Sequence, residues 1–468
     1  MITHETTVVI IGGGPGGYEA ALVAAQLGAG VTIVEKHGLG GAAVLTDCVP
    51  SKALIATADY MSDFQVASHL GVRLQDEDGD EVSDAVAQAG TVNERILDLA
   101  SAQSADIRSG LEQVGVRLVN GTARVAGRGL VVAESVDGGR EELPADVILV
   151  ATGATPRELP SAQPDGERIL TWQQIYGLAE LPEKIVVIGS GVTGAELAQA
   201  YLGLGSEVVL VSSRDRVLPG EDADAATVIE DVFRKRGMEV LSRSRASAVA
   251  RSGDGVVVTL EDGRTVEGSH ALLAVGSIPQ TRGIGLEELG VELSESGHIR
   301  VDRVSRTSAP GVYAAGDCTG VLPLASVAAM QGRIAMWHAL GDAVTPLNVR
   351  GVAATIFTEP EIATVGISQQ AADESSDVEV VMLPLGRNPR AKMQGISDGF
   401  VKLFCRKGYG TLLGGVIVAP KASELIFPVA LAVQNRLNVD QIASTITVYP
   451  SLSGSIAEAA RQLHQSGD

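Results

Sequence analysis

Two copies of one short pattern constrain the fold of this chain more than any other feature. An apolar, β-branched run at residues 7–11 leads directly into a glycine cluster, an alanine-rich segment and a second apolar run that ends at Glu35. Residues 184–213 repeat the same order. A strand, a glycine turn, a helix and a parallel strand make up the βαβ unit of doubly wound α/β proteins. Two such units predict a duplicated doubly wound architecture.

The first glycine cluster has the spacing G-x-G-x-x-G, with Gly12, Gly14 and Gly17 at the glycine positions. In this motif the first glycine permits a tight turn, the second lets a pyrophosphate approach the backbone, and the third allows close packing of helix on strand. The helix start offers free N–H groups to the phosphates. Glu35 ends the next strand, where an acidic side chain binds the hydroxyls of an adenosine ribose. We expect a dinucleotide site here.

The second cluster, Gly189, Gly191 and Gly194, predicts a second dinucleotide site. Its second strand ends at Ser212 instead of an acid, and Arg214 follows on the next loop. A carboxylate would repel a 2′-phosphate, whereas serine and arginine can bind one. The pattern therefore favours acceptance of NADPH as well as NADH. The alternative is that the arginine only lies on a solvated loop.

Composition narrows the class of protein. At 468 residues the chain is too long for one core, and 45% hydrophobic with 20% charged residues is typical of a soluble protein. The net charge of −21 argues against nucleic acid and membrane surfaces as partners. Three cysteines cannot form a disulfide framework, and the start of the chain has no signal-peptide pattern. We expect a cytoplasmic protein.

The regions outside the two βαβ units are less informative. Residues 50–113 read as helical, interrupted by the acidic run DEDGDEVSD at 76–84. That run lacks the glycine and the glutamate that a calcium loop requires, so we interpret it as a solvated turn and expect no metal site. Beyond residue 345 the pattern changes to mixed strands and helices, which indicates a separate α+β domain.

Four further motifs carry a family resemblance. The stretches VILVATGATP (147–156), ALLAVGSIPQT (271–281) and GVYAAGDCTG (311–320) resemble, in order and spacing, the motifs of the flavoprotein disulfide reductases. TIFTEPEIATVG (355–366) is similar to the start of that family's dimerisation domain. The resemblance covers essentially the whole chain.

The resemblance implies an α/β fold with two Rossmann-like three-layer dinucleotide-binding domains and a C-terminal α+β dimerisation domain. It implies FAD at the first site, NADPH or NADH at the second, and a homodimer. The expected boundaries are 1–155 for the first part of the FAD-binding domain, 156–275 for the NAD(P)-binding domain, 276–345 for the second part of the FAD-binding domain, and 346–468 for the dimerisation domain.

The resemblance also implies roles for individual residues. Lys52 matches the family lysine beside flavin N5, where a cation stabilises the reduced ring, and Glu196 matches the glutamate that pairs with that lysine. Asp317 would accept hydrogen bonds from the ribityl hydroxyls of FAD. The remaining expected cofactor contacts are Thr152, Gly153 and Gly316 for FAD and Gly276 for the nicotinamide nucleotide.

The chain departs from the family pattern where the disulfide chemistry lies. The motif C-x-x-x-x-C has Ala43 at its first cysteine and Cys48 at its second. At the position of the family's C-terminal H-P-T-x-x-E motif, this chain has Tyr449 in place of the histidine and Gly454 in place of the glutamate. An alanine cannot form a disulfide, and tyrosine, with a pKa near ~10, is a poor base near neutrality. Dithiol exchange is therefore excluded, while all features for binding FAD and nicotinamide remain.

We therefore expect an FAD-dependent NAD(P)H oxidoreductase that passes hydride to FAD and then electrons to small acceptors, with quinones as the expected acceptor class. A soluble pyridine nucleotide transhydrogenase is the nearest alternative. A further alternative makes Cys48 a peroxidase or coenzyme A disulfide reductase centre, its thiolate favoured by a helix start and Lys52. Otherwise Cys48 is a buried thiol without a redox role. A redox-inert FAD-binding protein is the least favoured reading.

Overall fold

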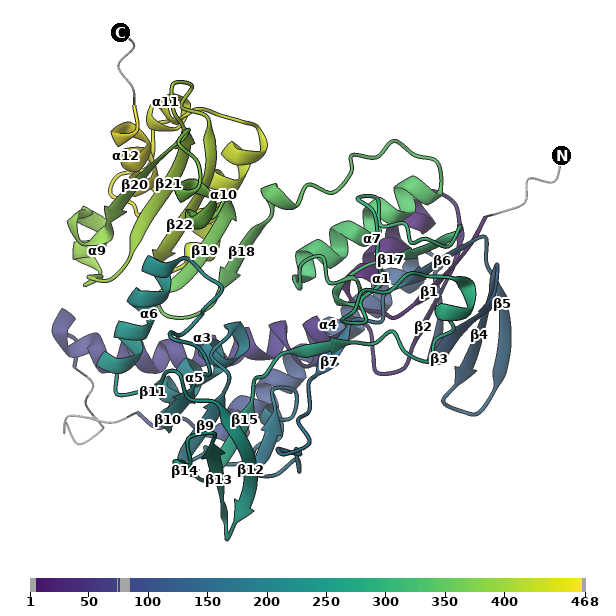
Figure 1. Cartoon of the computed structure of the whole chain (residues 1–468), viewed down its shortest axis with the longest axis horizontal. Coiled ribbons are helices and arrows are strands. Elements are labelled where there is room, and N and C mark those ends of the chain that lie inside the picture. Colours follow the sequence, from purple (N-terminus) through teal and green to yellow (C-terminus); the bar gives the residue numbers. More distant parts are fainter. Residues whose placement is uncertain (1–5, 74, 76–84, 465–468) are drawn as a thin grey trace.

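The computed structural model describes residues 6–73, 75 and 85–464. The acidic run at 76–84 lies outside the described residues, so the expected solvated turn has no structural account. Figure 1 shows two sheet-containing units built from the first three quarters of the chain and a separate C-terminal domain. We call these the first unit, the second unit and the C-terminal domain.

The first unit is built on a seven-stranded sheet with the order β17-β6-β1-β2-β3-β4-β5. Strands β17 to β3 run parallel, and β3 continues into an antiparallel meander with β4 and β5. The strands are β1 (Thr7–Ile11), β2 (Gly30–Glu35), β3 (Arg117–Gly127), β4 (Leu130–Ser135), β5 (Arg140–Pro144), β6 (Val147–Val150) and β17 (Val312–Ala314).

Alternation of side chains along β1 builds a core on each face of this parallel sheet. Val8 and Ile10 pack with helices α1 (Pro15–Gln26), α4 (Ala89–Gln113) and α7 (Ala325–Ala339). Val9 and Ile11 pack on the other face against the meander. The first unit is therefore three layers deep: helices, parallel sheet and meander.

The second unit repeats this plan. Its parallel sheet has the order β11-β10-β9-β15-β8, and a three-stranded antiparallel sheet, β12-β13-β14, covers one face while α5 and α6 cover the other. The elements are β8 (Ile169–Thr171), β9 (Lys184–Ile188), α5 (Val192–Leu204), β10 (Glu207–Val211), α6 (Ala223–Lys235), β11 (Glu239–Leu241), β12 (Ala246–Ser252), β13 (Gly255–Leu260), β14 (Thr265–Gly268) and β15 (His270–Leu273).

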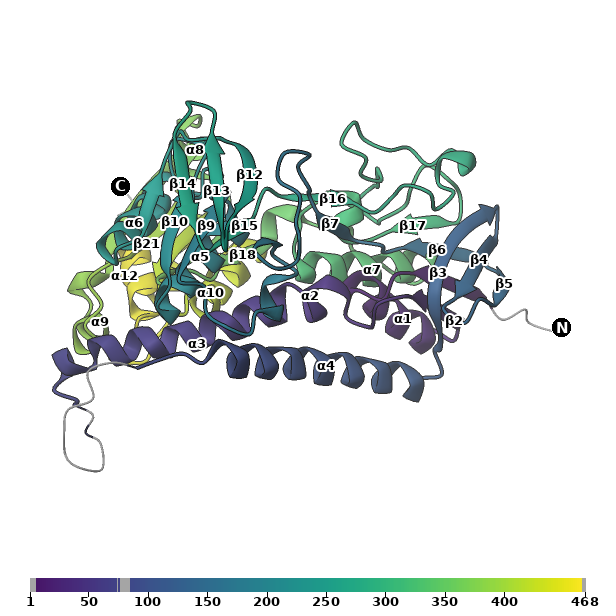
Figure 2. The same cartoon turned by 90° about the horizontal axis from the view of Figure 1, so that it is seen from below.

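Two connections hold the units together. Helix α3 (Cys48–Val66) follows the short helix α2 (Gly41–Leu45) and packs on both α4 and α5, as Figure 2 shows. Strands β7 (Ala154–Pro156) and β16 (Ser277–Pro279) pair where the chain passes from the first unit into the second and back. The boundary expected after residue 155 falls within β7, and the one expected after residue 275 falls just before β16.

The C-terminal domain is an antiparallel sheet of order β18-β19-β22-β21-β20 with helices packed on it. Its elements are β18 (Ala353–Ile356), β19 (Glu361–Gly366), β20 (Val378–Pro384), β21 (Phe400–Arg406), β22 (Leu412–Ala419), α10 (Ala422–Gln434), α11 (Val439–Ala443) and α12 (Gly454–Gln462). The fold class expected from the sequence, two three-layer dinucleotide-binding domains and an α+β domain, is confirmed.

A buried lysine joins the C-terminal domain to the second unit. Lys402 on β21 is 1% exposed, and its ammonium lies 2.8 Å from an Asp222 carboxylate oxygen and 2.6 Å from one of Asp224. Asp222 also caps α6 by accepting the backbone N–H groups of the first turn. A buried cation is tolerated only when it is paired, so this contact fixes α6 against the sheet.

We predict that Lys402→Met destabilises the protein, because it leaves the buried Asp222 carboxylate without its cation. Removing one partner of a buried pair costs about 3–5 kcal/mol. Lys235→Met is the matched control: Lys235 is 73% exposed and lies 3.8 Å from Asp398 across the same contact. An exposed pair contributes about 1 kcal/mol or less. Thermal unfolding should show a clearly lower midpoint for Lys402→Met only, and equal midpoints for both variants would contradict this.

Candidate active site

The first glycine turn leaves room for a ligand at one position only. A Cβ at Gly12 would overlap the carbonyl oxygen of Ala151, and one at Gly17 would overlap the carbonyl oxygen of Gly12. At Gly14, by contrast, the nearest atom would be the Cα of Gly41, at 4.0 Å. Close packing thus requires glycine at positions 12 and 17. Gly14 has room beside its backbone, which a pyrophosphate needs in order to approach it.

The second glycine turn repeats this distribution. A Cβ at Gly189 would overlap the carbonyl oxygen of Ala274, and one at Gly194 would overlap that of Gly189. A Cβ at Gly191 would meet nothing within 4 Å. Both turns therefore fit a dinucleotide phosphate at the start of the following helix, α1 or α5.

Glu35 lies beside the first turn at the end of β2. One carboxylate oxygen accepts the Gly13 N–H at 2.7 Å, and the other accepts the His37 N–H at 2.7 Å. These two bonds fix the carboxylate next to the glycine turn, at the place expected for a ribose-binding acid.

The other residues expected to bind FAD follow strands of the same sheet. Thr152 and Gly153 come after β6, and Asp317 comes after β17, so all lie at the carboxyl edge to which the β1 turn belongs. The Thr152 hydroxyl donates to the Gln280 carbonyl at 2.6 Å. Gly316 has a φ of 84° and donates its N–H to the Gln331 amide oxygen, which fixes the turn before Asp317. Gly276, at the matching edge of the second sheet, has a φ of 92° and open space around its Cα.

Lys52 and Glu196 form an ion pair between α3 and α5, with Nζ 2.7 Å from a carboxylate oxygen. Glu196 is 3% exposed, and its second oxygen accepts the N–H of Phe357 at 2.9 Å. Lys52 is 29% exposed, and its Nζ lies 5.0 Å from the centre of the Phe357 ring. Burial works against the charged ammonium, but Glu196 outweighs it, and the pKa of Lys52 is raised. The lysine therefore stays cationic at neutral pH.

Cys48 begins α3 beside this pair but is a neutral thiol. Burial, and then the neighbouring Asp47 charge, raise the pKa of Cys48 to about 11, although Lys52 opposes this. The raised pKa favours the alternative in which Cys48 is a buried thiol, because the cost of burying the anion is the largest contribution to the shift. Cys318 and Cys405 are fully buried.

Sequence reasoning missed Asp47, which lies at the same helix start. Burial raises the pKa of Asp47 to about 6; Lys52 opposes the shift, while Glu196 and Asp317 add to it. A signal for this residue was present, because Asp47 is the only acidic residue between Glu35 and Lys52 in the sequence.

The loop after β10 is fixed by Ser212. Its side chain is fully buried, its hydroxyl lies 2.7 Å from that of Ser190, and it accepts the Arg214 N–H at 3.1 Å. The Ser212 hydroxyl thus holds the loop, and Arg214 is left exposed. Among the described residues, Nε of Arg216 and the hydroxyl of Ser242 are buried without a hydrogen-bond partner. Unpaired polar atoms beside this loop fit a polar ligand.

The positions of the missing acid–base pair lie on the C-terminal domain. Tyr449 is 81% exposed, and Gly454 begins α12. His464, the nearest histidine in the sequence, is exposed and pairs with Asp440. Tyrosine and glycine therefore occupy the positions of the family histidine and glutamate.

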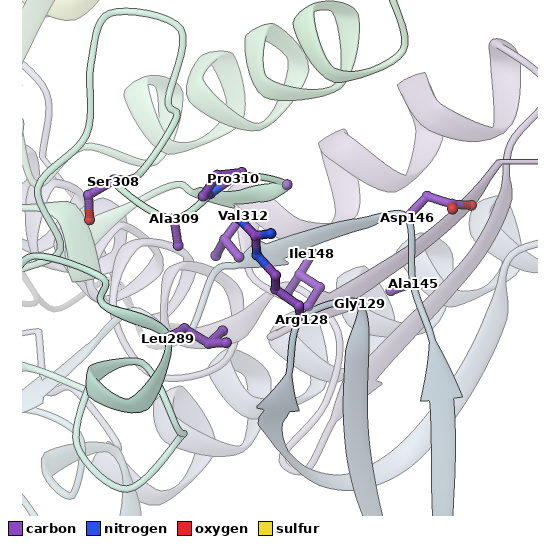
Figure 3. A pocket seen from close by; sticks show the side chains of 11 residues that line it. Arg128, Gly129, Ala145, Asp146, Ile148, Leu289, Ser308, Ala309, Pro310 and Val312 are labelled. Atoms are coloured by element: carbon purple, nitrogen blue, oxygen red, sulfur yellow. The ribbon is translucent and has the colours of Figure 1, made fainter.

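A small cavity of about 100 Å³ lies away from these residues (Figure 3). It is enclosed by the turn between β3 and β4, the start of β6 and the segment before β17, with Arg128, Asp146, Leu289 and Pro310 among its lining residues. Ligand sites for drug-sized molecules usually measure about 300 Å³ or more. The cavity holds none of the expected cofactor residues and is too small for a dinucleotide.

Within the part of the chain that the structure describes, no helix has the length and apolar character needed to cross a bilayer. The same residues contain no group of three or more His, Cys, Asp or Glu side chains that could hold a metal ion.

The chain is similar to known proteins along almost its whole length. The chain is 54% identical to a protein named NAD(P)H dehydrogenase (quinone) from Mycobacterium tuberculosis, over 99% of this chain and 95% of the relative. It is 34% identical to the dihydrolipoyl dehydrogenase of Bacillus subtilis, over 97% of this chain and 96% of that protein. The crystal structure of LpdA from M. tuberculosis superimposes with a TM-score of 0.93 at 53% identity, covering 98% of this chain and 100% of that one.

A more distant structure, the flavoprotein disulfide reductase RclA of Escherichia coli, shares the fold at 23% identity with a TM-score of 0.85, over 97% of this chain and 99% of that one. Residues 6–332 match the pyridine nucleotide-disulphide oxidoreductase family, and residues 352–460 match the dimerisation domain of that family. Members of this family are oxidoreductases that use FAD and NAD(P)H. The chain belongs to the pyridine nucleotide-disulphide oxidoreductase family.

Proposed function

We propose that this protein is an FAD-dependent NAD(P)H oxidoreductase that reduces quinones without a redox disulfide. The observation that carries the proposal is the intact Lys52–Glu196 pair between two open glycine turns, beside a Cys48 that has no thiol partner at Ala43. A quinone accepts electrons without a protein thiol, so it suits a site that keeps the cofactor-binding residues but lacks the redox disulfide. The relative at 54% identity is named for the same activity.

The residues present fit the two cofactors. Bound FAD supplies a ring that takes a hydride from NAD(P)H and gives the electrons to an acceptor. Gly14 and Gly191 leave the backbone open to each pyrophosphate, and Glu35 is placed to accept hydrogen bonds from ribose hydroxyls. Lys52, held by Glu196, keeps a positive charge at the site, which stabilises a reduced, electron-rich ring.

We also propose a homodimer formed through the C-terminal domain. The match to the dimerisation domain covers residues 352–460. Within this range several large apolar side chains are exposed: Phe427 (68%), Leu431 (48%), Ile446 (98%), Val448 (77%) and Tyr449 (81%). Exposed apolar side chains gathered in one domain indicate a protein interface. The three unpaired cysteines fit a reducing compartment, so we place the protein in the cytoplasm.

The main test compares acceptors. With NADPH or NADH as donor, the FAD-loaded protein should reduce a soluble quinone rapidly and leave lipoamide and glutathione disulfide unreduced, because Ala43 cannot supply the second thiol. Nucleotide oxidation is followed by absorbance. The dihydrolipoyl dehydrogenase of B. subtilis serves as the positive control for lipoamide.

Lipoamide reduction at a rate comparable to quinone reduction would contradict the proposal. Reduction of a thio-substituted NAD⁺ analogue by NADPH, without quinone reduction, would identify a transhydrogenase instead. Peroxide or coenzyme A disulfide reduction that disappears in Cys48→Ser would restore the single-cysteine alternative.

The second test concerns the nucleotide. Arg214→Ala should raise the KM for NADPH about tenfold or more and leave the KM for NADH unchanged, because a lost hydrogen bond to a charged group costs about 1.5–3 kcal/mol. Arg245→Ala is the control, since Arg245 is also an exposed arginine of the second unit and pairs with Glu261. Equal changes for both nucleotides would show that Arg214 does not contact the 2′-phosphate.

A further inference from the structure

The Lys52–Glu196 pair by itself supplies little positive charge to a ligand beside it. The ammonium lies 2.7 Å from the carboxylate, so the two charges largely cancel at a distance. A lysine is also a flexible chain with a compact charged head, so a single contact does not fix the position of the charge. Transfer of a hydride from NAD(P)H adds one negative charge to the ring of FAD. A third group that holds the ammonium in place would strengthen its effect on that charge.

Phe357 makes two contacts with this pair, one through its backbone and one through its ring. Its N–H donates to the second carboxylate oxygen of Glu196 at 2.9 Å. Its ring centre lies 5.0 Å from Nζ of Lys52, with the ammonium over the ring. The negative face of an aromatic ring attracts a cation within about 6 Å of its centre. The ammonium is therefore held by a carboxylate and by an aromatic ring.

The position of Phe357 is fixed by helix α5. Glu196 and Gln199 are three residues apart on this helix, so their side chains share one face. Glu196 accepts the N–H of Phe357, and Gln199, which is 5% exposed, accepts the N–H of Glu359 at 2.7 Å. The segment after β18 is thus attached to α5 at two positions. The partly buried Phe357 ring also packs against the hydrophobic core that α3 and α5 share.

We propose that the Phe357 ring positions the Lys52 ammonium for the reduction of FAD by NAD(P)H. The inference rests on the proposed function and adds to it a positioning residue from the C-terminal domain. The ring attracts the ammonium without neutralising it, whereas a second carboxylate would cancel its charge. The positive charge therefore stays available to the ring of FAD when the hydride arrives.

Side-chain replacement isolates the contribution of the ring, because the backbone N–H that binds Glu196 stays in place. Phe357→Leu removes the ring and keeps an apolar side chain. In this FAD-loaded variant, the midpoint potential of FAD should become more negative. Anaerobic reduction of the flavin by NADPH, followed by absorbance, should slow about threefold to tenfold, the range of a cation–π contact. Phe357→Tyr keeps the ring and should restore both values. Phe357→Met is the second ringless variant and replaces Phe357→Leu if that protein does not fold.

Phe400→Leu is the matched control, because the Phe400 ring lies 5.5 Å from the Lys402 ammonium at a different contact between domains. It should lower the thermal unfolding midpoint and leave the potential of FAD unchanged. A second readout is the NMR spectrum of protein labelled with carbon-13 at the lysine Cε. The Lys52 signal is identified by its loss in Lys52→Arg. Phe357→Leu should move this signal by removing the ring current, and Phe400→Leu should not.

An unchanged potential and an unchanged rate of flavin reduction in Phe357→Leu would overturn the inference. So would a loss that Phe357→Tyr does not restore, or an equal shift of the potential in Phe400→Leu. An unmoved Lys52 signal would show that the ring does not hold the ammonium, and would also overturn it. If the wild-type protein reduces no quinone, the proposed function fails, and the midpoint potentials, which need no acceptor, still decide the inference.

Discussion

The buried carboxylate of Glu196 is the constraint on which the arrangement of this protein depends. Only 3% of the Glu196 side chain is exposed, so its negative charge needs partners within the protein. Lys52 of the first unit pairs with it, and the Phe357 N–H of the C-terminal domain donates a hydrogen bond to it. A buried charge that loses its partners is costly, so one group from each of three parts of the chain must meet at this point. The same contact brings α3, with Lys52, against α5, the helix that follows the second glycine turn.

The electrostatics of the site raise the pKa of the remaining thiol, Cys48. Family members with two cysteines need an ionised thiol for exchange. Here Asp47 stands directly before Cys48, and burial together with this carboxyl group keeps the thiol protonated. The loss of the first cysteine at Ala43 and of the base at Tyr449 is thus matched by a local environment that disfavours thiolate formation. The site is organised for transfer between bound cofactors and a diffusible acceptor.

Local rules were sufficient to predict the two glycine turns and the sheets on either side of them. Gly12 and Gly189 are required by close backbone contacts that follow directly from the strand–turn–helix geometry. The Lys52–Glu196 pair was predicted because the family resemblance links the two motifs, which are far apart in the chain. Residue type and spacing alone would not have joined them.

Other features depend on burial and could not be predicted from spacing. The raised pKa of Asp47 follows from burial and from charges on α5 and after β17, and the raised pKa of Cys48 also has burial as its largest cause. Ser212 was expected to face the nucleotide, yet its hydroxyl is turned to Ser190 inside the unit. Nothing in the sequence pattern singles out Lys402, although it is the buried cation between two domains.

The central claim is that the flavin and nicotinamide half of the family mechanism is intact and the disulfide half is absent. Anaerobic titration of the FAD-loaded protein with dithionite, followed by NADPH titration of a second sample, tests it most directly. We predict that the protein takes up a single electron pair per bound FAD, and that NADPH delivers the same pair. Uptake of a second pair would reveal a redox disulfide or an equivalent centre, and failure of NADPH to bleach the yellow absorbance would show that hydride transfer has been lost; either result would contradict the account.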